Sequence, residues 1–355
     1  MKVFHCTHCA QLLFFENSVC VPCGRALGYL PEEGLLVSLE RPAGAEGQNR
    51  WRSERTGRTY RLCDNYVKYN VCNWVVREDD PEALCRSCRL TKTIPNLGKA
   101  GNDRLWYKLE VAKRRLLYTF DRLGLPYRGR HEDPEHGLQF DFMEEALTGH
   151  AEGVITVNIQ EADDAHRVKT RIEMQEPYRT LLGHFRHESG HYYWERLIST
   201  SPAIGSFRVL FGDERADYQD ALKRNYGQGP PPNWQDEYVS SYAAMHPWED
   251  WAETWAHYLH MVDTLETASA CGVSIEPPRH DEPTLLEVPN PVGDADVSFE
   301  KLISSWATIT YVLNNLNRGL GNDDAYPFVL SDTATKKLHF VHTTIAARST
   351  RFAAG

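Results

Sequence analysis

Two histidines with a glutamate between them stand at a spacing that suits a catalytic zinc ion. The run is His187-Glu188-Ser-Gly-His191. In a helix, residues four apart lie on one face, so both imidazoles would point at a single metal ion. Glu188 lies about 100° further round the helix, where it would reach a water on the metal and act as a general base. The pattern therefore predicts metal-assisted hydrolysis.

A catalytic zinc ion of this kind needs a third protein ligand. Trp194 and Leu197 occupy the positions at which a metzincin carries glycine and histidine, which excludes that solution. A carboxylate from a later helix is the alternative, and Glu249 and Glu253 lie one helical turn apart on a shared face. Either of them can bind the metal while the other accepts the free N–H of a ligand histidine.

Eight of the nine cysteines lie before residue 89 and form two groups of four. The first group is two CxxC pairs, each of which places two thiolates on one tight turn, so the pairs complete a tetrahedral zinc site. The second has one CxxC pair, and no histidine lies between His8 and His131 to replace a cysteine. We expect two closed, structural zinc sites, formed by Cys6, Cys9, Cys20 and Cys23 and by Cys63, Cys72, Cys85 and Cys88. Cys271 stands apart, and a buried apolar position is expected for it.

The composition, with 41% hydrophobic and 25% charged residues, is that of a globular protein. No run of 18 apolar residues is present, which argues against a membrane span and a membrane partner. The first 100 residues hold 14 Lys and Arg against 11 Asp and Glu, and the remainder holds 25 against 38. So acidic a C-terminal part makes a nucleic acid an unfavourable partner. Because the cysteine motif begins at Cys6, we expect no signal peptide and a cytoplasmic protein with reduced thiols.

The histidine pair falls in a predicted helix over residues 177–198, with a proline near its start. A second helix begins at Pro247 and carries both glutamates. Gly190 costs about 1 kcal/mol relative to alanine in mid-helix, so we expect another segment to pack closely against it. The other expected elements are helices at 106–123 and 299–316, a strand at 153–159, and loops at 225–234 and 276–296.

These elements predict an α+β chain with three parts. A zinc ribbon at residues 1–34 and a second four-cysteine module at 35–100 precede a zincin-like catalytic domain at 101–355. The strand at 153–159 is expected to lie beside the site and to pair with an extended peptide by adding it to the sheet edge.

The histidine pair followed by two spaced glutamates resembles the gluzincin peptidases. The run Glu249-Asp-Trp-Ala-Glu253-Thr-Trp resembles the glutamate-bearing helix of the anthrax lethal-factor type. This resemblance implies that Glu249 is the zinc ligand and Glu253 its outer partner. It also implies that Tyr242, seven residues before the ligand, stabilises the oxyanion of the reaction. Asp250 departs from the pattern, because that helix carries an aromatic residue there.

The cysteine pairs, with Cys72-Asn-Trp and Cys85-x2-Cys88, are similar to a bacterial family of zinc-binding metallopeptidases that begin with a zinc ribbon. This resemblance covers nearly the whole chain and implies a peptide or protein substrate. We therefore expect a gluzincin-type metallopeptidase with one catalytic and two structural zinc ions. Two alternatives stay open: a zincin that hydrolyses a non-peptide amide, and a zinc-ribbon module that binds protein or nucleic acid and carries an accessory zincin.

Overall fold

The computed structural model describes residues 1–174, 176–294 and 297–352 and confirms the predicted α+β class. The chain divides into two compact units. The N-terminal unit contains residues 2–121 and 126–169, and the C-terminal unit contains Met1, residues 122–125 and residues 170–355. No helix among the described residues has both the length and the apolar character that crossing a bilayer requires.

A five-stranded antiparallel sheet occupies the first part of the N-terminal unit. Its strands follow one another in sequence order and are β3 (Ala26–Leu30), β4 (Leu35–Glu40), β5 (Trp51–Ser53), β6 (Thr59–Leu62) and β7 (Val75–Arg77). Apolar side chains such as Leu30, Val37 and Tyr60 alternate inward along these strands and form one buried cluster. A short hairpin of β1 (Phe4–His5) and β2 (Leu12–Leu13) precedes the sheet. A short helix, α1 (Asp64–Tyr69), connects β6 to β7, and another, α2 (Arg86–Arg89), follows β7.

A second sheet of four strands lies in the same unit, in the order β10-β11-β9-β8. The strands are β8 (Thr91–Thr93), β9 (Gln139–Met143), β10 (Gly149–Ala151) and β11 (Val154–Asn158), and the associated helices are α3 (Asn102–Arg122), η1 (Ile159–Ala162) and α4 (Asp164–Glu173). The predicted strand at 153–159 is present as β11. The expectation that it adds a peptide at a sheet edge is wrong, because β11 is hydrogen-bonded on both sides, to β10 and to β9.

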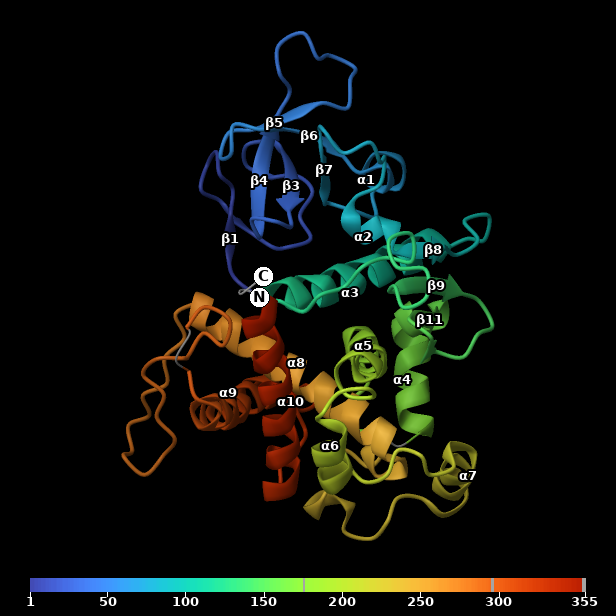
Figure 1. Ribbon diagram of the computed structural model, residues 1–355. Helices are drawn as coiled ribbons and strands as arrows, with labels where there is room; N and C mark the ends of the chain where they lie inside the picture. Colours follow the sequence, from blue (N-terminus) through green and yellow to red (C-terminus); the bar gives the residue numbers. More distant parts are fainter. Residues whose placement is uncertain (175, 295–296, 353–355) are drawn as a thin grey trace. The chain divides into compact units, whose positions relative to one another are not determined.

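The C-terminal unit is helical, and its longest helix, α8 (Pro247–Ala270), contacts four others (Figure 1). Those neighbours are α5 (Leu181–Leu197), α6 (Ile204–Phe211), α9 (Phe299–Gly319) and α10 (Asp332–Phe352). The remaining elements are α7 (Tyr218–Gln228), η2 (Trp234–Asp236) and η3 (Ala243–Met245). Trp251 and Trp255 of α8 are fully buried, so this helix forms the core of the unit.

Capping side chains set where these helices begin. The α8 helix begins at Pro247 as predicted, and the His246 ring accepts a hydrogen bond from the Trp248 amide at 3.1 Å. The α5 helix begins four residues later than predicted, because Thr180 Oγ1 accepts from the Gly183 amide and thereby caps it.

Two further expectations need correction. The α7 helix occupies the first part of the loop expected at 225–234 and ends before Gly229, whose φ is +74°. Cys271 is exposed rather than buried, because it caps the C-terminus of α8, after the last turn that packs against the core. Part of the loop expected at 276–296 lies outside the described residues.

Candidate metal centres

The α5 and α8 helices approach each other closely at Gly190. A Cβ atom at this position would come within 2.8 Å of Ala252 Cα, which confirms the expected close packing. Trp251 Nε1 donates a hydrogen bond to the Gly190 carbonyl at 2.8 Å, and Trp255 Nε1 donates one to Ser189 Oγ at 3.1 Å. The histidine-bearing helix is therefore fixed directly to the helix that carries the two glutamates.

This packing brings His187, His191 and Glu249 together. Glu249 Oε2 lies 3.0 Å from Nε2 of His187 and 3.5 Å from Nε2 of His191. Two ligand atoms that each lie about 2.1 Å from a tetrahedral zinc ion are separated by roughly 3.4 Å, so these distances suit one shared ion. One ligand atom from each residue falls within 4.8 Å of the other two.

The surroundings of Glu249 also fit a cation. The residue is only 2% exposed, and among the described residues no hydrogen bond reaches its Oε2 atom. A buried carboxylate oxygen without a donor is costly unless it coordinates a metal ion. The two imidazoles overcome the effect of burial and hold the pKa of Glu249 well below its usual value, so the carboxylate is ionised and able to bind.

Glu253 contacts His187 at Nδ1, the ring nitrogen that does not face Glu249. Its Oε1 lies 2.7 Å from His187 Nδ1, and its Oε2 accepts a hydrogen bond from Ser240 Oγ at 2.6 Å. Burial opposes the ionisation of Glu253, but the hydrogen bonds from His187 and Ser240 and the charges of the nearby imidazoles together outweigh it and lower the pKa to about 2. Because a carboxylate only accepts, Nδ1 of His187 must donate, which leaves its Nε2 available as a metal ligand.

The two residues expected to take part in the chemistry lie beside this cluster. Glu188 is buried, and burial raises its pKa, while the charges of His187 and His191 act in the opposite direction. The Tyr242 ring centroid lies 5.9 Å from that of His187. Burial and then the charge of Glu249 raise the pKa of Tyr242, so its phenol keeps a proton to donate.

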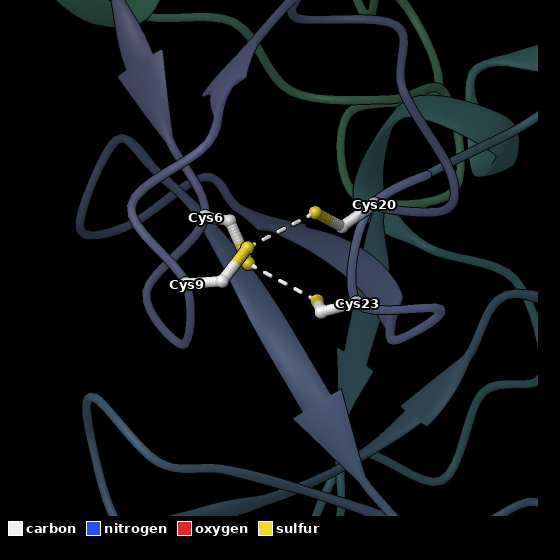
Figure 2. A group of neighbouring side chains, drawn as sticks. All are labelled: Cys6, Cys9, Cys20 and Cys23. Atoms are coloured by element: carbon white, nitrogen blue, oxygen red, sulfur yellow. Dashed lines mark hydrogen bonds between the residues drawn. The ribbon is translucent and has the colours of Figure 1, made fainter.

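The first cysteine cluster joins the first two CxxC turns of the N-terminal unit, Cys6–Cys9 and Cys20–Cys23. Cys6 Sγ lies 3.8 Å from Cys23 Sγ, and Cys9 Sγ lies 3.6 Å from Cys20 Sγ (Figure 2). Sulfur atoms that share one tetrahedral zinc ion are about 3.8 Å apart, because each Zn–S bond is about 2.3 Å long. Cys9 is exposed and Cys23 is half-buried, so one side of this cluster faces solvent.

The second cluster is enclosed, and all four of its cysteines are buried: Cys63, Cys72, Cys85 and Cys88. Cys72 Sγ lies 3.6 Å from Cys85 Sγ. Two backbone amides donate to sulfur atoms at 3.3 Å, Trp74 N to Cys72 and Cys85 N to Cys63. The nine cysteines, all within the described residues, form no disulfide, so both clusters present thiols for a metal ion.

Three residues around the histidine cluster were not expected from the sequence. Ser240 donates to Glu253, the ring centroid of Trp248 lies 3.8 Å from that of His191, and Tyr218 Oη donates to Glu249 Oε1 at 2.9 Å. Burial and then the charge of Glu249 raise the pKa of Tyr218, so it remains a donor. No motif spacing marks Tyr218, because it lies 31 residues before Glu249 on a separate helix.

The fold and these clusters define a class, namely α+β proteins in which cysteine-bound zinc modules accompany a helical His-His-Glu centre. Residues 102–344 match the family described as "Putative zinc-binding metallo-peptidase", and residues 3–99 match a zinc-ribbon domain family. The chain belongs to this zinc-binding metallopeptidase family, which confirms the second resemblance drawn from the cysteine pairs.

Relatives in Mycobacterium share almost the full length of the chain. Uncharacterized proteins of Mycobacterium bovis and of two strains of Mycobacterium tuberculosis are 45% identical over 351 residues. The matched region covers 97% of this chain and 95% of each relative. No solved structure shows a significant match.

Proposed function

We propose that the chain is a gluzincin-type zinc peptidase whose catalytic ion is held by His187, His191 and Glu249. The observation that carries the proposal is the convergence of their donor atoms within 4.8 Å of one another. The helices that supply them pack together at Gly190, where a side chain would prevent the approach. Membership of the zinc-binding metallopeptidase family supports the same assignment.

Each nearby residue has a defined part in this proposal. A bound zinc ion supplies a Lewis acid that lowers the pKa of water at the site. Glu188 accepts the proton of the attacking water and passes it to the leaving amine. Tyr242 donates a hydrogen bond to the developing oxyanion. Glu253 holds His187 in the tautomer that presents Nε2.

The two cysteine clusters are assigned as structural zinc sites. Four thiolates complete the coordination of a tetrahedral ion and leave no position for water, so these sites stabilise the N-terminal unit without taking part in hydrolysis. The proposal therefore comprises three zinc ions per chain. The substrate is a peptide or protein met in the cytoplasm, and neither a membrane nor a nucleic acid is required.

The first test separates hydrolysis from metal binding. Glu188→Gln keeps the size of the side chain but removes the base, so it should abolish cleavage of a peptide library while the zinc content stays unchanged. Glu195→Gln is the matched control, because Glu195 lies on the same helix and is exposed. Retained cleavage in Glu188→Gln would reject the assignment of the base.

The second test counts the metal ions. Elemental analysis of the purified chain should give three zinc ions, and His187→Ala should lose one of them. Cleavage that persists in His187→Ala, with an unchanged zinc content, would reject the proposed catalytic centre.

A further inference from the structure

The two carboxylate oxygens of Glu249 have different surroundings. Oε2 faces Nε2 of both His187 and His191 and accepts no hydrogen bond from the described residues. Oε1 accepts a hydrogen bond from the Tyr218 hydroxyl at 2.9 Å. Tyr218 thus donates its hydrogen bond to the carboxylate oxygen of Glu249 that does not face the imidazoles.

A histidine fixes the segment that carries Tyr218 to the helix that carries Glu249. His246 Nε2 lies 3.0 Å from the Ala216 carbonyl oxygen, two residues before Tyr218. His246 Nδ1 accepts from the Trp248 amide in the first turn of α8. A carbonyl only accepts, so Nε2 must carry the proton and Nδ1 must be bare, and a neutral imidazole satisfies both contacts at once. His246 is buried, which protects this connection from water.

The phenol ring is also held by aromatic contacts. Its centroid lies 5.4 Å from that of His246 and 6.1 Å from that of Trp248, both in edge-to-face geometry. Trp248 in turn lies against the His191 ring. Asp217 caps the helix that begins at Tyr218 by accepting from the Asp220 amide at 2.8 Å. The hydroxyl is therefore placed by several independent contacts rather than by its bond to Glu249 alone.

We propose that Tyr218 is a positioning residue of the metal centre, whose hydroxyl restricts Glu249 to binding through Oε2 alone. The inference rests on the proposed function in one respect, since it takes Glu249 as a ligand. A carboxylate can bind a metal through one oxygen or through both, and a second oxygen would occupy the position that a catalytic site keeps open. Hydrogen bonds to a ligating carboxylate fix its orientation and increase the affinity of the site for the metal ion.

The test is a metal-affinity measurement on the full chain. Tyr218→Phe removes only the hydroxyl, and Tyr311→Phe is the matched control, because Tyr311 is exposed on α9 of the same unit. The zinc ion that His187→Ala loses is titrated against a competing chelator. Loss of an outer-shell partner costs about 10- to 100-fold in affinity, so this range is expected for Tyr218→Phe and no change for Tyr311→Phe. A change of less than about twofold, below that range, would overturn the inference.

A double-mutant cycle distinguishes positioning from a general structural effect. If Tyr218 acts through the carboxylate, Tyr218→Phe should weaken zinc binding in the parent chain but add little in a Glu249→Gln background. Fully additive losses would overturn the inference, because they would show that the hydroxyl acts elsewhere. Retention of the two cysteine-bound zinc ions, and a thermal midpoint that matches that of the parent when the histidine site is kept free of zinc, exclude misfolding as the cause.

The outcomes also separate this inference from the proposed function. If the parent chain holds no zinc ion that depends on His187, both are overturned. If that ion is present and depends on Tyr218 but no peptide is cleaved, the positioning role stands while the peptidase assignment fails. If peptides are cleaved and Tyr218→Phe binds zinc as tightly as the parent, only the positioning role fails.

Discussion

Gly190 packs directly against the backbone of Ala252, so closely that a Cβ atom on Gly190 would lie 2.8 Å from Ala252 Cα. The obstacle is backbone rather than the end of a flexible side chain, so the two helices cannot accommodate a methyl group without separating. Any separation would move the histidines of α5 away from the glutamates of α8. The proposed metal centre therefore depends on a residue that is not one of its proposed ligands.

Gly190→Ala should destabilise the C-terminal unit and weaken the histidine-bound zinc. Overpacking costs about 1–3 kcal/mol, and because the obstacle here is backbone we expect the upper part of this range, which exceeds the gain of about 1 kcal/mol that alanine brings to a helix. Urea unfolding of Gly205→Ala provides the control, because a Cβ there meets nothing within 4 Å. Equal stability of the two variants would contradict the packing argument.

Single substitutions of the two glutamates of α8 should weaken zinc binding to different extents. Glu249→Ala removes a ligand and should leave the centre without zinc after dialysis. Glu253→Ala removes the acceptor of the His187 Nδ1 proton, and we expect zinc to bind about 10- to 100-fold more weakly but still measurably. If Glu253→Ala loses the metal and Glu249→Ala keeps it, the assignments must be exchanged.

A buried ion pair joins α8 to α10 and should be sensitive to the loss of one partner. Asp250 is fully buried, and Lys337 of α10 lies 2.6 Å away at 3% exposure. Lys337→Met would leave the carboxylate unpaired, at a cost of about 3–5 kcal/mol. The double variant Asp250→Asn with Lys337→Met should recover much of this loss in urea unfolding. A double variant as unstable as the single one would count against the pairing.

The same pair predicts a dependence of stability on pH. Burial raises the pKa of Asp250 to about 7, and Lys337 only partly opposes this rise. Since the folded state binds the proton more tightly than the unfolded state does, the contribution of Asp250 is greatest below about pH 4 and is lost as pH rises to about 7. The difference in unfolding free energy between Asp250→Asn and the parent should therefore increase in favour of the variant from pH 5 to pH 8. A difference that shrinks over this range would show the opposite linkage.

The two cysteine clusters should release zinc at different rates. Cys9 is exposed, whereas every thiol of the second cluster is buried. A thiol reagent should therefore free one zinc ion quickly and the other only when the N-terminal unit unfolds, as followed with a zinc-sensitive dye. Cys9→Ala and Cys72→Ala give the matched comparison, with the larger loss of stability expected for Cys72→Ala. Simultaneous release of both ions would show that exposure does not control access.

The features that the sequence predicts correctly, such as the shared face of the histidine pair and the start of α8, depend on relations between residues close together in the chain. The His187–His191 spacing places both rings on one face wherever the chain is helical, because that relation depends on helix geometry alone. The start of α8 at Pro247 follows in the same way from the φ angle of proline. The five-stranded sheet was missed, because strands such as β5 have only three residues and are defined by their pairing with distant segments.

The amino-acid sequence by itself determined which residues can be ligands: two cysteine groups, a histidine pair and two candidate glutamates. Tertiary structure alone decided that Glu249 Oε2 faces the imidazoles, that Glu253 meets Nδ1 of His187, and that Tyr218 reaches Glu249 from another helix. The physical reason is that helical periodicity relates residues within one turn or two. The relation between helices is set by side-chain packing, here by the contact of Gly190 with α8.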